Sequence, residues 1–243
     1  MKTKLDRLKS MIEHMGSLAV AFSGGVDSTF LLKVAHDVLK SKATALTVKF
    51  STFPEREFNQ AIQCAQAIGV ELRVIIVEET DIENFTQNPV DRCYHCKKAL
   101  FGKMMEFSEK EGFRVVADGS NADDPHDTRP GMRALKELAI PSPLLQAGLT
   151  KDEIRQLSRQ MGLASWDRPS AACLASRIPY GQIITKEKLR MVENAEQFLQ
   201  DLGFKQVRVR HHGDIARIEV AASEFDKFFI GDLTSRITLK LKA

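Results

Sequence analysis

The sequence predicts an α/β protein, with a parallel sheet flanked by helices and a smaller C-terminal α+β domain. Three observations support this prediction. Apolar runs rich in Val, Ile and Leu alternate with helical patterns through the first two thirds of the chain, as strands buried on both faces do. Beyond about residue 165 the pattern changes to one helix and two strands of alternating polarity. The 243 residues are enough for one large domain or two modest ones.

The elements of the first domain, residues 1–165, are expected in a regular order. Helices are expected at 1–16, 27–40, 54–69, 95–112 and 150–162, and strands at 17–23, 43–50, 71–78 and 113–119. Thr150 and Glu153 form a capping box at the start of the last helix, and Gly162 ends it. Residues 120–145 are rich in Asp, Asn, Pro and Gly, which predicts a loop with only a brief return to helix.

The second domain, residues 166–243, is expected to bind the substrate and to form a homo-oligomer. A helix at about 186–202 precedes two strands within residues 205–222. Val207 and Val209 alternate with Arg208 and Arg210, so one face of this strand is expected to be buried and the other polar.

Composition and charge place limits on the location and partners of the protein. The chain has no run of 18 apolar residues and no signal peptide at its start, so we expect a cytoplasmic protein without a membrane partner. The net charge of +3 is mild and argues against a nucleic-acid partner. Cysteines in such a chain favour metal binding or redox chemistry over disulfides.

A glycine-rich motif, Ser23-Gly24-Gly25-Val26-Asp27-Ser28, joins the first expected strand to the following helix. Paired glycines allow a close backbone approach to an anion, and a helix N-terminus supplies free N–H groups. Ser23 and Ser28 add hydroxyl donors, and Asp27 either caps the helix or helps to hold Mg²⁺. The motif lacks the lysine of the Walker loop, so we expect a phosphate site of another design. The alternative is a simple glycine turn with Ser and Asp caps.

This motif resembles the signature of the ATP pyrophosphatases, or PP-loop enzymes. In that superfamily the loop holds the β,γ-pyrophosphate while ATP is cleaved between its α and β phosphates. The segments FPERE, RCYHCKKALF, DGSNADDPHDTRPG and RPSAACLASRIPYG further resemble the LarE family of ATP-dependent sulfur transferases, over about residues 10–220. The resemblance implies ATP, Mg²⁺ and a pyridinium-3,5-dicarboxylate mononucleotide. A carboxylate of this mononucleotide would be adenylated and then converted to a thiocarboxylate, as in nickel-pincer nucleotide biosynthesis.

The four cysteines bear on the source of sulfur. Cys64 lies on the apolar stripe of a helix and is expected to be buried. The LarE family has two designs: one cysteine that gives up its own sulfur, or three cysteines that hold a [4Fe-4S] cluster. Cys93, Cys96 and Cys173 match the order of the second design, in which one iron stays open for an extra sulfide supplied by a sulfur donor. The alternatives are a zinc site that includes His95, a redox pair, and unligated or sacrificial thiols.

The resemblance also assigns roles in the reaction. Cys173, Ser176 and Arg177 are expected to be catalytic. Arg208 and Arg210 lie two residues apart on one strand face and would clasp the phosphate of the substrate, because bidentate arginines suit phosphate. The alternative is a solvated strand face. Glu196 and Glu219 are expected to lie near the same pocket.

Further nucleotide contacts are expected at the carboxyl ends of the parallel strands, where α/β sheets bind ligands. Gly119, Asn121 and Asp123 follow the fourth strand directly, and Val48 lies in the second. An Asx-rich turn is the alternative interpretation of the first three.

Other activities remain open at this point. A tRNA thiolase of the PP-loop class would need a large basic surface, which the charge argues against. An amide-forming ligase of the NAD- or GMP-synthetase kind would not need three cysteines. A non-catalytic iron–sulfur or nucleotide-binding regulator is the third alternative.

Overall fold

The computed structural model describes residues 1–124, 130–169 and 173–242. The chain divides into two compact units. Unit 1 comprises Met1–Phe85 and Asp91–Ala171, and unit 2 comprises Thr86–Val90 and Ala172–Ala243. The expected boundary at residue 165 stays a prediction, because compactness does not show where an independently folding domain ends.

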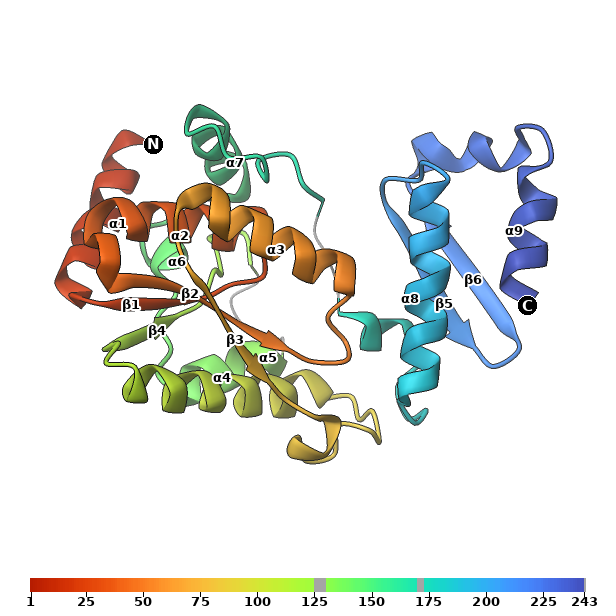
Figure 1. Ribbon diagram of the computed structural model, residues 1–243, viewed down its shortest axis with the longest axis horizontal. Helices are drawn as coiled ribbons and strands as arrows, with labels where there is room; N and C mark the ends of the chain where they lie inside the picture. The colour runs from red at the N-terminus through yellow and green to blue at the C-terminus, as the bar shows by residue number, and fades with distance from the viewer. Residues whose placement is uncertain (125–129, 170–172, 243) are drawn as a thin grey trace. The chain divides into compact units, whose positions relative to one another are not determined.

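Unit 1 is built on a parallel sheet with the strand order β3-β2-β1-β4 (Figure 1). The strands are β1 (Leu18–Ala21), β2 (Ala43–Lys49), β3 (Leu72–Ile76) and β4 (Val115–Ala117). β1 pairs with β2 and with β4, and β2 pairs with β3, all in parallel. This confirms the predicted fold class. The carboxyl ends of the strands therefore lie at one edge of the sheet, where the phosphate loop begins.

Helices cover both faces of this sheet. They are α1 (Lys2–Met15), α2 (Val26–Leu39), α3 (Glu55–Ile68), α4 (Arg92–Lys110), α5 (Pro130–Glu137), α6 (Pro143–Gln146) and α7 (Lys151–Gln160). Figure 1 shows α4 and α5 on one face and α1, α2 and α7 on the other. The predicted capping box of α7 is present, since Thr150 and Glu153 satisfy each other's backbone N–H groups. Cys64 is buried in the core of this unit, as predicted.

Unit 2 is a small α+β arrangement. It contains η3 (Leu174–Arg177), α8 (Lys186–Asp201), β5 (Val207–His212), β6 (Ile215–Val220), η4 (Ala222–Phe229) and α9 (Leu233–Lys242). β5 and β6 pair antiparallel. Val207 and Val209 are buried, and Arg208 and Arg210 are partly exposed, so the predicted alternation along this strand is confirmed.

The short segment Thr86–Val90 belongs to unit 2, although the rest of that unit begins more than 80 residues later in the sequence. The side-chain amide of Asn88 donates to the carbonyl oxygens of Ile178 at 3.3 Å and of Pro179 at 2.8 Å. The carbonyl oxygen of Asn88 in turn accepts from the N–H of Gly181 at 2.9 Å. No local pattern in residues 86–90 indicates these contacts, and the sequence analysis did not predict them.

Candidate active site

The phosphate loop lies between β1 and α2, where the motif predicted it. The hydroxyl of Ser28 donates to the carbonyl oxygen of Gly25 at 3.2 Å and accepts from the N–H of Ser23 at 3.3 Å. The two serine hydroxyl oxygens lie 3.2 Å apart. The first N–H groups of α2 have no partner within the helix, so this end of the helix suits an anion.

Close packing surrounds two glycines at this site, Gly24 in the loop and Gly119 after β4. Gly24 has φ +72°, and a Cβ there would lie 2.8 Å from the Cα of Ala61 in α3. Gly119 follows β4, and a Cβ on it would lie 3.3 Å from the backbone N of Ser28. The loop therefore packs directly against α3 and the end of β4, with no room for a side chain at Gly24 and little at Gly119.

Asp27 does not cap α2, so that alternative is wrong. The capping residue is Gly25, and no side chain makes a capping hydrogen bond. Oδ2 of Asp27 instead lies 2.5 Å from Nζ of Lys151. Burial raises the pKa of Asp27, and the contacts with Lys151 oppose that rise.

The second carboxylate oxygen of Asp27 fits a metal ion. Oδ1 is buried and has no hydrogen-bond partner among the described residues. Mg²⁺ prefers a carboxylate oxygen together with water and substrate phosphates. Asp27 therefore suits the Mg²⁺ that accompanies ATP, with Oδ1 left for the ion while Oδ2 contacts Lys151.

The residues after β4 form an Asx turn. Oδ1 of Asn121 accepts from the N–H of Asp123 at 2.9 Å, and Oδ2 of Asp123 accepts from the N–H of Lys151 at 2.7 Å. The carboxylate of Asp123 therefore supports the first turn of α7. Asn121 is buried, as is Val48 in β2. Nucleotide binding by Val48, Gly119, Asn121 and Asp123 stays a prediction.

Two cations beside the loop were missed by the sequence analysis. One is Lys151, and the other is Arg168, whose Nη1 donates to the carbonyl oxygen of Gly24 at 2.6 Å. Arg155 donates in turn to the carbonyl oxygen of Arg168 at 3.2 Å. Lys151 lies 124 residues from its partner Asp27 in sequence, and Arg168 lies 144 residues from Gly24. No local signal in the sequence could have connected them.

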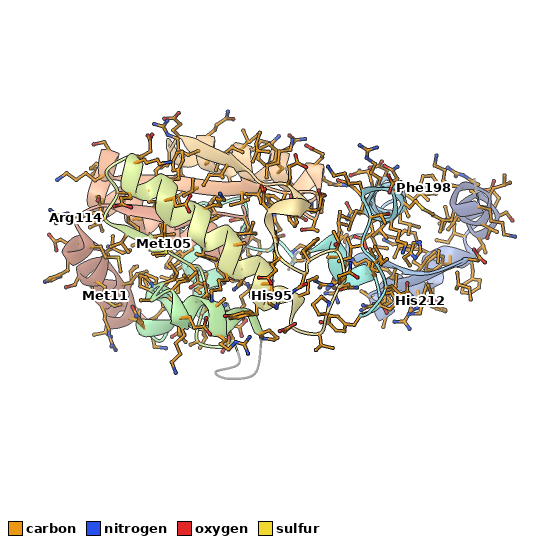
Figure 2. All side chains as sticks on the ribbon, turned by 90° about the horizontal axis from the view of Figure 1, so that it is seen from below. Met11, His95, Met105, Arg114, Phe198 and His212 are labelled. Atoms are coloured by element: carbon orange, nitrogen blue, oxygen red, sulfur yellow. The ribbon has the colours of Figure 1, made fainter. Side chains whose placement is uncertain are left out.

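Cys93 and Cys96 lie in the first turns of α4, three residues apart and therefore on one side of the helix. Cys93 is exposed and Cys96 is partly exposed. Nη2 of Arg92 lies 3.9 Å from Sγ of Cys93. His95, near the start of α4 in Figure 2, has its Nε2 3.3 Å from Oδ2 of Asp91.

These two thiols can bind the same metal centre, and the described residues of their own unit offer no third Cys, His, Asp or Glu ligand to it. Cys173 is exposed and belongs to unit 2, directly before η3. Within the described residues, no three Cys, His, Asp or Glu side chains form a metal-binding group. The [4Fe-4S] cluster and the zinc alternative therefore stay predictions.

In unit 2, Arg177 and Glu196 form a buried, bidentate ion pair. Nε of Arg177 lies 2.7 Å from Oε1, and Nη2 lies 2.9 Å from Oε2. Nη1 of Arg177 also donates to Oγ of Ser176 at 2.9 Å, and the N–H of Val209 donates to Oε1 at 2.8 Å. Arg177 and Glu196 thus connect η3, α8 and β5, and through Nη1 they orient the hydroxyl of Ser176.

The arginines of β5 differ in their partners. Nε of Arg210 lies 2.7 Å from Oε1 of Glu219, which Arg217 also contacts at 2.7 Å. The hydrogen bond from Arg210 is the main reason that the pKa of Glu219 falls to about 2. Arg208 lies opposite Glu219 in the ladder, but no hydrogen bond or ion pair to the described residues holds its guanidinium. Arg208 is therefore available to an anionic ligand.

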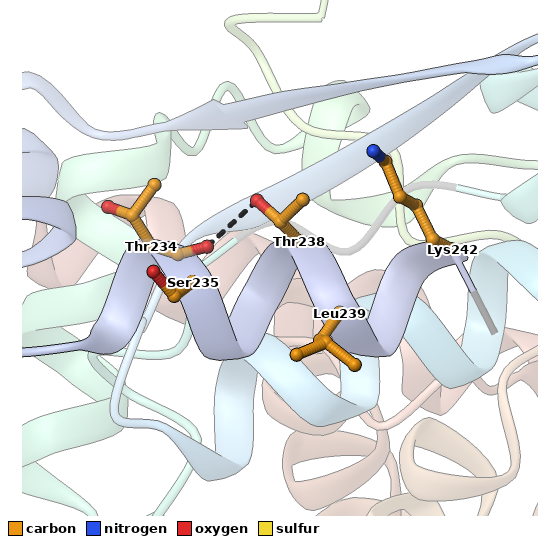
Figure 3. Close-up of a pocket in the computed structure, with 5 residues that line it drawn as sticks. All are labelled: Thr234, Ser235, Thr238, Leu239 and Lys242. Carbon is orange, nitrogen blue, oxygen red and sulfur yellow. Dashed lines mark hydrogen bonds between the residues drawn. The ribbon is translucent and has the colours of Figure 1, made fainter.

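One surface hollow lies elsewhere in unit 2, along α9 (Figure 3). Its described lining residues are Thr234, Ser235, Thr238, Leu239 and Lys242, and none of them was predicted for the site. Thr238 donates to the carbonyl oxygen of Thr234 at 2.8 Å, a bond within the helix itself. We assign this hollow no part in the reaction.

The fold and the phosphate loop together define the class. A parallel sheet with a Ser-Gly-Gly-x-Asp-Ser loop between β1 and α2 is the arrangement of a PP-loop ATP pyrophosphatase. The sequence profile of the asparagine synthase family matches residues 9–123, which include this loop. Across the part of the chain that the structure describes, no helix is both long enough and apolar enough to span a membrane.

Comparison with known proteins narrows the class to a family. The chain is 33% identical over 229 residues to pyridinium-3,5-bisthiocarboxylic acid mononucleotide synthase of Lactiplantibacillus plantarum, covering 94% of this chain and 83% of the relative. It is 40% identical to the uncharacterized protein slr1717 of Synechocystis sp., covering 94% of this chain and 85% of the relative. It is also 30% identical to the uncharacterized protein MJ0830 of Methanocaldococcus jannaschii, covering 89% of this chain and 84% of the relative. The chain belongs to the LarE family of ATP-dependent sulfur transferases and is an enzyme.

Proposed function

We propose that this enzyme adenylates a carboxylate of a pyridinium-3,5-dicarboxylate mononucleotide and converts it to a thiocarboxylate. The observation that carries the proposal is the phosphate loop with the unpaired oxygen of Asp27, in a chain 33% identical to a synthase of the bisthiocarboxylic acid mononucleotide. A carboxylate is a poor electrophile, so the addition of sulfur requires a leaving group such as AMP.

The first step uses the loop residues. The Ser23–Ser28 turn and the N-terminus of α2 bind the β,γ-pyrophosphate, and Asp27 binds the accompanying Mg²⁺. A carboxylate oxygen of the substrate attacks the α-phosphorus, and the bond to the β-phosphate oxygen breaks. Pyrophosphate leaves with the electron pair, and an acyl adenylate remains. Val48, Gly119, Asn121 and Asp123 are proposed to contact the nucleotide.

The substrate mononucleotide is assigned to the arginines of β5. Arg208, whose guanidinium has no partner among the described residues, and Arg210 are proposed to bind its phosphate. Glu219 holds Arg210 in place at 2.7 Å. Arg177 and Glu196 are proposed to position Ser176 at the substrate.

The second step adds sulfur. A sulfur nucleophile attacks the carbonyl carbon of the acyl adenylate, and AMP leaves with the electrons of the carbon–oxygen bond. Cys93, Cys96 and Cys173 are proposed to hold a [4Fe-4S] cluster; thiolates are its usual ligands, and two of the three share one side of α4. When bound, such a cluster would supply a sulfide on its open iron, and an external donor would replace that sulfide.

The experiment follows pyrophosphate and AMP release by the anaerobically purified protein with the dicarboxylate mononucleotide, MgATP and sulfide. We expect release that depends on the mononucleotide, with a thiocarboxylate product detected by mass spectrometry. Release that instead requires ammonia would indicate an amide ligase. Release that requires tRNA would indicate a thiolase. Either result contradicts the proposal.

Iron and sulfide analysis tests the cluster separately. We expect about four irons per chain, lost when Cys93, Cys96 or Cys173 is replaced by alanine. Cys64→Ala is the matched control, because this thiol lies in the core of unit 1. Zinc in place of iron, or full sulfur transfer by the Cys93→Ala/Cys96→Ala variant, contradicts a cluster and leaves the adenylation step to be judged on its own.

A further inference from the structure

The phosphate loop supplies no positive charge of its own. Residues 22–29, FSGGVDST, contain no lysine or arginine, and their one charged side chain is the carboxylate of Asp27. A triphosphate carries several negative charges, and more charge develops on the leaving pyrophosphate. Loops of the Walker type meet this need with a lysine inside the motif. In this protein the cations must come from elsewhere in the fold.

Lys151 is the first candidate. It is the first residue of α7, which lies beside α2 in unit 1 (Figure 1). Its side chain is 27% exposed, and its Nζ contacts Oδ2 of Asp27 at 2.5 Å. The backbone of Lys151 is fixed independently, because Asp123 accepts from its N–H at 2.7 Å. The side chain can therefore change partner without moving the helix.

Arg168 is the second candidate. Only its Nη1 has a hydrogen-bond partner among the described residues, the carbonyl oxygen of Gly24 at 2.6 Å. A guanidinium has five N–H donors, so the others are available beside the loop. The carbonyl oxygen of Arg168 accepts from Arg155 of α7, which anchors the residue.

We infer that Lys151 and Arg168 are the phosphate-binding cations of this loop, and that Lys151 leaves Asp27 for the pyrophosphate group when Mg²⁺ binds. The inference rests on the ATP site of the proposed function. Mg²⁺ on the other carboxylate oxygen, Oδ1, would neutralise Asp27 and so weaken its contact with Lys151 at Oδ2. The released ammonium then lies on a flexible four-carbon stem close to the loop. Arg168 keeps its bond to Gly24 and directs its remaining donors to the anion.

The test measures binding by calorimetry, with Mg²⁺ present, of three probes: α,β-methylene-ATP, pyrophosphate and AMP. In Lys151→Met and Arg168→Met, we expect the Kd for the first two probes to rise about 10- to 100-fold. The Kd for AMP should change less than about threefold, because a cation that meets only the β and γ phosphates does not contact AMP.

Lys33→Met is the matched control. Lys33 also has a side chain that is 27% exposed and an aspartate partner, Asp37, at 2.5 Å. Both residues belong to α2, away from the loop, so binding of all three probes should be unchanged. A merely structural role for Arg168 would lower the melting temperature and weaken AMP and pyrophosphate alike.

A second measurement uses the unmodified chain and so does not depend on the variants folding. Mg²⁺ with pyrophosphate should slow reductive methylation of Lys151 and phenylglyoxal modification of Arg168, and should leave Lys33 unaffected. Equal modification with and without pyrophosphate, or Met variants that bind like Lys33→Met, would overturn the inference. If the wild-type protein binds neither α,β-methylene-ATP nor pyrophosphate, the proposed function itself fails.

Discussion

Replacing Glu196 by alanine is expected to destabilise unit 2 by about 3–5 kcal/mol, the usual cost of breaking a buried ion pair. The carboxylate accepts from Arg177 at 2.7 and 2.9 Å and from the N–H of Val209 at 2.8 Å. The side chain of Arg177 is only 5% exposed, so water cannot replace the lost carboxylate. The variant would remove the carboxylate that faces this buried guanidinium and leave the N–H of Val209 without its acceptor.

The assay is urea unfolding followed by far-UV circular dichroism, together with hydrogen exchange of the peptide that contains Val209. Glu219→Ala is the matched control. Glu219 also pairs with arginines at 2.7 Å, but its side chain is 34% exposed, so its loss should cost at most about 1 kcal/mol. Hydrogen exchange should quicken at Val209 in the first variant and stay close to wild type in the second.

Equal costs for the two variants would refute the reasoning, because they would show that the carboxylate of Glu196 is hydrated in solution. The double variant Arg177→Met/Glu196→Leu provides a further check. Apolar residues of similar size remove both charges together, so much of the lost stability should return. A double variant as unstable as Glu196→Ala would mean that packing, not uncompensated charge, causes the loss.

Two further changes test other parts of the structure. Gly24→Ala should lower both the stability and the affinity for α,β-methylene-ATP. The new Cβ would lie 2.8 Å from the backbone of Ala61, and the φ of +72° would cost about 1–2 kcal/mol of backbone strain in addition. Gly69→Ala is the control, because Gly69 has φ +82° but no neighbour within 4 Å of a Cβ; this variant should show the cost of the strain alone and leave binding intact. If the two variants have equal effects in urea unfolding and in calorimetry, the close packing at Gly24 is not important. Glu224→Gln tests pH dependence, since Lys227 and two backbone N–H groups lower the pKa of Glu224 from 4.5 to about 2. The charged Glu224 stabilises the fold by about 1–3 kcal/mol; this stabilisation is full above pH 4.5 and is lost as the pH falls towards 2. The urea midpoint of the wild type should therefore approach that of the variant over this range. A difference between the two midpoints that stays constant with pH would contradict the prediction.

Local patterns in the sequence were sufficient to predict the parallel sheet, the position of the Ser23–Ser28 loop and most of the helices. The exception is residues 120–145, where a loop with a brief return to helix was expected and two helices, α5 and α6, form. Each correct prediction depends on residues close together in the chain: the period of apolar residues, a capping box at Thr150, and glycines between a strand and a helix. The alternation of Val207 and Val209 with two arginines likewise predicted which face of β5 is buried. The family followed from motifs of the same local kind.

The tertiary structure alone decided how charged groups are paired. Asp27 was predicted to cap a helix or to bind Mg²⁺, yet it contacts Lys151, which is 124 residues away in sequence. Arg168 reaches Gly24 across 144 residues. A contact of this kind leaves no periodic or spacing signal, because it depends on where two distant parts of the backbone meet. The sequence by itself therefore determined which loop is the candidate phosphate site, and only the folded chain determined which cations lie beside it.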